Sequence, residues 1–157
     1  MLQLLRRRLQ GEREGGFTLI ELMVVVLIIA ILIAIAIPTF LGARTRAQDR
    51  AAQSNLRNAL TAEKSFYTDS QAYTAVTASL KAIEPSLTYN ANAAPSAVNQ
   101  VYVDASTTGT VILGTKSASD TCFYIKDVAT GASSGTTYGR DSACPAPASA
   151  SVALSSW

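Results

Sequence analysis

The chain has 157 residues, which leaves room for one domain plus an appendage. Of these residues 48% are hydrophobic and 15% are charged, a composition that excludes a disordered chain. The net charge of +2 argues against a dedicated nucleic-acid binder, and the lack of histidine removes the usual general base and metal ligand of enzymes. Two cysteines exclude a four-thiolate zinc site and allow at most one intramolecular disulfide.

Most of the excess apolar residues lie in one run near the N-terminus. Leu22 to Ile37 is an unbroken stretch of sixteen apolar residues. Counted from Phe17, the stretch would form a helix about 30 Å long, which is the thickness of a bilayer's hydrocarbon layer. One carboxylate at its entrance, Glu21, does not outweigh the insertion tendency of so many aliphatic side chains. We therefore expect this segment to enter a membrane.

Two simple explanations compete for this segment. A secretory signal peptide would account for the arginines at positions 6–8 and for Ala34-Ile35-Ala36 as a cleavage site. However, the apolar run continues straight through that site, and Pro38 follows closely. A plain single-pass anchor would explain the length of the run, but it gives no reason for the residues in front of it.

Those preceding residues form a specific motif. Gly15 to Leu22 read GGFTLIEL, so a glycine pair is followed by an aromatic residue, three further residues and a glutamate that opens the apolar helix. With this motif the chain closely resembles the type IV pilin and pseudopilin family. The resemblance covers about Gly15 to Tyr73 in detail and only the general plan beyond.

The resemblance implies a processing step. Met1 to Gly16 would be a leader, which a prepilin peptidase removes by cutting between Gly16 and Phe17. The same enzyme would then methylate the new amino group of Phe17. The chain would accordingly be the substrate of this enzyme, and glycine at position 16 allows close approach to the backbone.

Glu21 is the candidate assembly residue. Once Phe17 is freed, its amine is a cation at the edge of a low-dielectric phase, where an unpaired charge is costly. Glu21 is an anion in the same layer and could pair with this amine in its own chain or in a neighbouring subunit. Pairing between subunits would set the axial register of the helices. The alternative is that Glu21 simply lies at the membrane interface.

Pro38 and Gly42 mark the junction with the next segment. Proline removes a helical hydrogen bond and clashes with the preceding turn, so we expect a kink or local melting here. By resemblance, this region could unwind inside a filament. A mildly bent continuous helix is the alternative.

The helix is expected to continue from Phe17 to about Tyr67. Its second half carries an amphipathic stripe at helical spacing, formed by Ala52, Leu56, Ala59, Leu60, Glu63, Phe66 and Tyr67. Charged residues occupy the other faces. The basic residues at 44, 46 and 50 could be a nucleic-acid patch, but solvated or subunit-facing charges are the favoured interpretation.

Residues 74–157 are predicted to form a small β-rich head. Val76, Leu80 and Ile83 suggest a short helix before Pro85, and Leu87 to Asn99 is expected to be a loop. The strand candidates are Gln100–Asp104, Thr110–Leu113, Thr121–Val128 and Thr136–Arg140. Three or four antiparallel strands would cover the helical stripe, which gives an α+β fold with a long helix packed on a sheet. The expected divisions are 1–16, 17–43, 44–73 and 74–157.

The two cysteines are candidates for a covalent cross-link within this head. Cys122 and Cys144 could close a disulfide that strengthens a marginal core, and the resemblance implies such a C-terminal loop. Two reduced thiols are the alternative. No metal site is visible, because Asp120, Asp127 and Asp141 are too scattered. The tail from Ala146 is low in complexity and is expected to be loose.

The sequence thus predicts a structural subunit of a type IV pilus that assembles through its apolar helix, without a cofactor, small-molecule ligand or specific nucleic-acid site. Its partners would be further copies of itself, the prepilin peptidase, an assembly ATPase and a platform protein. It would wait as a single-pass protein of the cytoplasmic membrane, leader side in the cytoplasm, and then enter an extracellular filament. The alternatives are a pseudopilin of a secretion or DNA-uptake system and, more remotely, a membrane-anchored extracytoplasmic binding protein. An enzyme is not expected.

Overall fold

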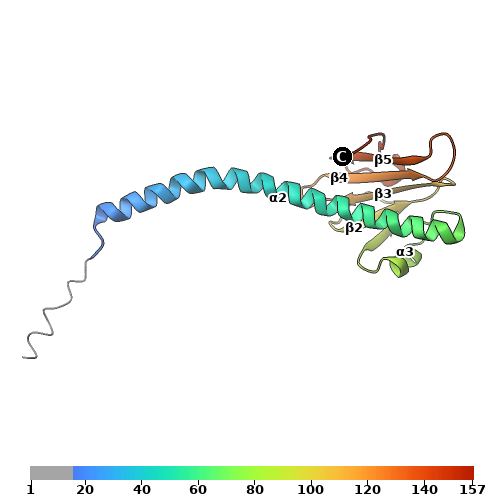
Figure 1. The fold of residues 1–157 in the computed structure, drawn as a ribbon, viewed down its shortest axis with the longest axis horizontal. Coiled ribbons are helices and arrows are strands. Elements are labelled where there is room, and N and C mark those ends of the chain that lie inside the picture. Colours follow the sequence, from blue (N-terminus) through green and yellow to red (C-terminus); the bar gives the residue numbers. More distant parts are fainter. Residues whose placement is uncertain (1–15) are drawn as a thin grey trace, which may run out of the picture. The chain divides into compact units, whose positions relative to one another are not determined.

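The computed structural model describes residues 16–157, so the leader prediction lies outside the described residues except for Gly16. The chain divides between Leu41 and Gly42 into two compact units, which are described separately below. The helix α2, Leu19–Ser70, contributes to both units (Figure 1).

Helix α2 is continuous over its 52 residues. The prediction of a helix from Phe17 to Tyr67 is confirmed, with ends that differ by two or three residues. Pro38 lies inside the helix and lacks the N–H that a regular turn would use. The Thr39 hydroxyl donates to the Ala36 carbonyl at 2.8 Å in the same turn. The kink expected at Pro38 and Gly42 stays a prediction, as does unwinding within a filament.

The second unit contains a five-stranded sheet in the order β1-β2-β3-β4-β5. Pairing is antiparallel from β2 to β5, whereas β1 is parallel to β2. The helix α3, Thr77–Ile83, precedes the sheet, as the apolar spacing predicted. The strands are β1 Thr88–Ala91, β2 Gln100–Asp104, β3 Thr110–Lys116, β4 Cys122–Val128 and β5 Gly135–Asp141.

Strand β1 corrects the prediction of a loop over Leu87 to Asn99. Leu87 and Tyr89 are buried in alternation with exposed Thr88, so this short segment has the period of a strand despite its Asn- and Ala-rich composition. The side-chain amide of Asn90 donates to the Gln100 Oε1 at 2.7 Å, which bridges β1 to β2. The strand was missed because polar residues are tolerated on an edge strand, where only one face is buried.

The core of the second unit lies between one face of α2 and one face of the sheet (Figure 1). The helix contributes small and medium side chains, and the sheet contributes the larger aliphatic and aromatic ones. This two-layer arrangement confirms the α+β class. The main buried residues are Ala52, Leu56, Ala59 and Ala62 from α2, and Val101, Val103, Val111, Leu113, Phe123 and Ile125 from the sheet.

The C-terminal tail packs against the sheet, so the expectation of a loose tail from Ala146 is wrong. A short 3-10 helix, η1 Pro147–Ser149, includes buried Pro147. Leu154 forms a two-bond antiparallel bridge with Tyr138, each bond 2.8 Å long. The Trp157 indole donates to the Gly139 carbonyl at 3.0 Å and lies edge-on to Tyr138. Low complexity hid this docking because the anchors are single residues among Ala and Ser.

Candidate assembly and processing segment

The start of α2 is closed by a reciprocal pair of hydrogen bonds between Thr18 and Glu21. Glu21 Oε2 accepts from the Thr18 backbone N–H at 2.9 Å and from its hydroxyl at 2.7 Å. The Glu21 backbone N–H in turn donates to Thr18 Oγ1 at 3.2 Å. This is a capping box, which satisfies backbone donors that a helix start leaves free. The Thr-x-x-Glu spacing carried this signal in the sequence, but the sequence analysis considered Glu21 only as a charge.

The cleavage and methylation candidates lie just before this cap. Gly16 and Phe17 precede the helix and are exposed, Phe17 to 86% of its surface. A protease needs accessible backbone outside a helix, and Gly16 and Phe17 meet this need. In the uncut chain the Phe17 nitrogen is still a peptide amide, so its pairing with Glu21 stays a prediction, as do the cleavage and methylation sites.

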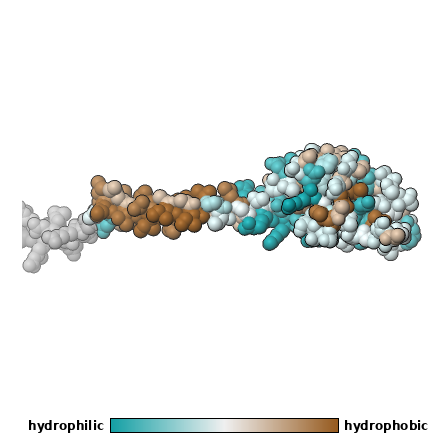
Figure 2. Space-filling model, turned by 90° about the horizontal axis from the view of Figure 1, so that it is seen from above, coloured by the Kyte–Doolittle hydropathy of each residue, from teal (hydrophilic) through white to brown (hydrophobic). Residues whose placement is uncertain are grey.

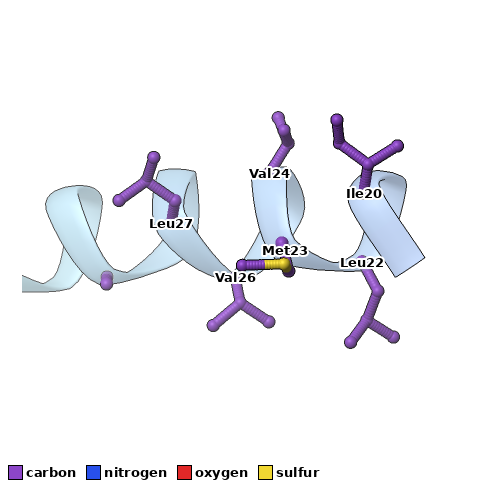
Figure 3. A pocket seen from close by; sticks show the side chains of 7 residues that line it. Ile20, Leu22, Met23, Val24, Val26 and Leu27 are labelled. Carbon is purple, nitrogen blue, oxygen red and sulfur yellow. The ribbon is translucent and has the colours of Figure 1, made fainter. Parts of the chain in front are cut away.

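The part of α2 that belongs to the first unit is apolar on all sides. Figure 3 shows Ile20 and Val24 on one side of the ribbon and Leu22 and Val26 on the opposite side. In the space-filling view the same stretch is almost entirely brown (Figure 2). The large aliphatic side chains from Leu19 to Leu41 are each about half exposed or more. A helix that is apolar all round is normally buried, either in a large core or in a membrane.

This stretch also has the length of a membrane span. Of the described residues, α2 is the one helix that is long and apolar enough to cross a bilayer, and none of its most apolar window is buried within the chain. By contrast, the face of residues 42–157 that is visible in Figure 2 is mostly white and teal, with scattered brown residues. The structure therefore leaves exposed the apolar surface that was predicted from the sequence to enter a membrane.

The predicted disulfide is present. Cys122 begins β4, and Cys144 follows β5, with Cα atoms 5.2 Å apart. The bond therefore ties the segment after β5 back to β4. Neither described cysteine is free.

Asp127, which was considered only as a metal ligand, has a structural role. Its carboxylate accepts hydrogen bonds from the hydroxyls of Tyr73 and Thr136 and forms an ion pair of 3.0 Å with Lys64. Burial raises the pKa of Asp127, but these hydrogen bonds and the Lys64 charge outweigh burial and hold the pKa below its ordinary value. Asp127 thereby links β4 and β5 to α2. Within residues 16–157 no cluster of His, Cys, Asp and Glu suited to a metal ion occurs.

Comparison with protein families finds one matching motif, which lies near the N-terminus. Residues 13–37 match the family model described as the prokaryotic N-terminal methylation motif. The match covers Gly16, Phe17 and Glu21 together with the whole apolar run from Leu22 to Ile37.

Three relatives match part of the chain. The type IV major pilin protein PilA of Myxococcus xanthus is 50% identical over 61 residues, which is 39% of this chain and 28% of the relative. The type IV wide pilus major component PilA4 of Thermus thermophilus is 37% identical over 65 residues, which is 41% of this chain and 50% of the relative. The type II secretion system core protein G of Pectobacterium carotovorum is 32% identical over 73 residues, which is 46% of this chain and 47% of the relative.

The matched part of the chain spans at most half the length of these relatives. Two of the three are type IV pilus components, and the third belongs to a secretion system. The resemblance to the type IV pilin and pseudopilin family is thereby confirmed, and the family model locates the methylation motif at residues 13–37.

Proposed function

We propose that the chain is the structural subunit of a type IV pilus and works by self-association rather than catalysis. The observation that carries this proposal is the apolar surface of α2 before Gly42, which nothing in the described chain covers. Such a surface must be covered by lipid or by protein, and copies of the same helix are a ready partner. The pilus components among the relatives support the second choice.

The proposed life of the chain has two stages. It first lies in the cytoplasmic membrane with its leader on the cytoplasmic side, where a prepilin peptidase cuts between Gly16 and Phe17 and methylates the Phe17 amine. An assembly ATPase and a platform protein then move it into an extracellular filament. Lifting the helix out of lipid is uphill unless other helices replace the lipid, which is why assembly needs an external energy source.

Glu21 would set the register of this assembly. Its carboxylate is oriented by the capping box with Thr18, at the end of the helix where the processed Phe17 amine would lie. Apolar packing alone can slide along the helix axis, whereas an ion pair at the membrane edge is satisfied at one offset only. In this proposal adhesion and register come from different residues.

Replacement of Glu21 tests the proposal. Glu21→Gln should permit membrane insertion, measured by cell fractionation, and removal of residues 1–16, measured by intact mass, but should strongly reduce the yield of fibres sheared from cells. Glu84→Gln is a matched control, because that carboxylate is exposed in the second unit and bonds only to Ser86 in the described chain. Normal fibre yield from Glu21→Gln cells would remove the register role, and a wild-type chain that keeps its leader would contradict the whole proposal.

A pseudopilin is the second candidate. The observation in its favour is the 32% identity to the secretion-system core protein, which extends over 73 residues. Both candidates share the N-terminal motif, so the motif does not separate them. Imaging of long surface fibres that contain this chain would favour the pilin, whereas secretion that depends on the chain, without such fibres, would favour the pseudopilin.

A further inference from the structure

Glu63 is a fully buried carboxyl group on α2. It lies in the apolar stripe that faces the sheet, close in sequence to Ala59 and Ala62, and its exposed fraction is 0%. No described salt bridge includes it, and its sequence neighbour Lys64 is directed to Asp127 instead. Carboxylates are almost never buried in this way without a partner. The position needs an explanation that core packing does not supply.

The two oxygens of Glu63 have different surroundings. Oε2 accepts the backbone N–H of Thr74 at 3.1 Å, which ties the connection between α2 and α3 to the helix. Oε1 has no hydrogen-bond partner among the described residues. One other buried side-chain atom shares this condition, the hydroxyl of Tyr89 on β1. Buried polar atoms without partners are rare, so the unpartnered Glu63 oxygen needs an explanation.

The groups that face Glu63 carry no positive charge. Tyr73 lies in the α2–α3 connection and Tyr89 on β1, and the Glu63 charge acts on both hydroxyls. Glu84, just after α3, adds a second negative charge near Tyr89. Burial, followed by Glu84 and Glu63, raises the pKa of Tyr89 to about 12, so this tyrosine stays protonated. An ionised Glu63 would therefore meet only neutral or negative groups.

These surroundings favour the neutral carboxylic acid. Burial raises the pKa of Glu63 to about 7, although the hydrogen bond from Thr74 opposes the rise. A proton on Glu63 removes the buried charge and leaves a neutral acid whose Oε1 costs less to keep unpartnered in the core than a carboxylate oxygen would. The bond to Thr74 joins α2 to the α2–α3 connection, and the neutral acid keeps this bond without a buried charge.

We propose that Glu63 is a proton-operated latch, which when protonated lets α2 pack tightly on the sheet and which on ionisation places an uncompensated charge in this core and loosens it. Because the folded chain binds this proton more tightly than the unfolded chain, the stabilisation is complete below about pH 4.5. It is lost as pH rises through about 7. The filament subunit would then have a head that is firmer in mildly acidic surroundings. The latch does not depend on the proposed function.

Urea unfolding of the full chain in detergent micelles at pH 5 and pH 8 tests the latch. In the wild type, the unfolding constant should rise on the order of 100-fold more between these pH values than in Glu63→Gln, whose amide does not titrate. Glu84→Gln is the control, because an exposed carboxyl whose pKa is lowered by its bonds with Ser86 should leave the wild-type pH dependence in place. Equal pH dependence in the wild type and Glu63→Gln would overturn the proposal.

A second measurement uses the wild type alone and covers the case in which Glu63→Gln does not fold. The Thr74 amide bonds directly to Glu63, so its NMR resonance reports this carboxyl. In a chain labelled with ¹⁵N-threonine, this resonance should titrate with a midpoint near pH 7. A midpoint below pH 5 would show an ordinary carboxylate and overturn the latch.

Discussion

At the scale of single residues, Gly139 shows how closely the tail is docked. A Cβ atom at this position would lie 2.4 Å from the Ser151 carbonyl oxygen, which belongs to the backbone and cannot rotate away. The Gly139 carbonyl also accepts the Trp157 indole N–H. Glycine is therefore required by the approach of a second backbone to β5, and not by an unusual φ angle.

Gly139→Ala is expected to destabilise the chain by about 1–3 kcal/mol, because the tail must move away and the Trp157 contact is lost with it. Urea unfolding and tryptophan fluorescence measure the two effects together, since the chain has one tryptophan. Gly42→Ala makes the same chemical change where the added Cβ meets only an ordinary contact at 3.5 Å, and should be neutral or stabilising. Equal stability of Gly139→Ala and the wild type would show that the tail is not held as described.

At the scale of elements, the disulfide joins β4 to the segment that follows β5. The two cysteines are 22 positions apart, so the bond closes a loop that includes the whole β4–β5 hairpin. A small sheet with a single helical layer has a limited core, and a covalent constraint on the unfolded chain is a substantial part of its stability.

Replacement of both cysteines by serine should lower the free energy of unfolding by about 3 kcal/mol. The measurement is urea unfolding of the double variant Cys122→Ser, Cys144→Ser. The wild type with a reductant serves as the comparison, because it removes the bond without changing a residue. If both samples unfold like the oxidised wild type, the bond constrains little.

The comparison between sequence and structure is also clearest for elements. Strands β2 to β5 were predictable because their β-branched and aromatic residues are separated by turns rich in Gly and Ser. Strand β1 was not, since only Leu87 and Tyr89 signal its buried face. The role of Asp127 was also unpredictable, because its bond with Tyr73 joins residues 54 positions apart. Glu63 was placed in the helical stripe, but its bond with Thr74 was not predicted. In contrast, the Thr18–Glu21 cap is local and its spacing was readable.

At the scale of the whole molecule, the two units place their apolar residues in opposite ways. Residues 42–157 enclose a core that runs from Ala52 to Ile125 and includes a contribution from Trp157. In the first unit the described apolar side chains are exposed. The core therefore does not draw on the first unit for its packing.

A chain limited to residues 42–157 should accordingly fold alone and remain monomeric without detergent, whereas the full chain should require detergent or form polymers. Circular dichroism would measure the folding of the fragment, and analytical ultracentrifugation would measure its size. A fragment that is unfolded, or that associates as readily as the full chain, would contradict this separation of roles.

The uniform apolar circumference of α2 before Gly42 has one more consequence. A helix surface covered evenly with Leu, Ile and Val is adhesive but not selective, because it packs equally well at any rotation about its axis. Exchanges among the aliphatic side chains between Leu22 and Ile37 should then have little effect on assembly. Shifting Glu21 by a single position, in contrast, would rotate the carboxylate about 100° around the helix axis. Assembly should therefore tolerate substitutions within the apolar run but not at the position of the acid, only a few residues away.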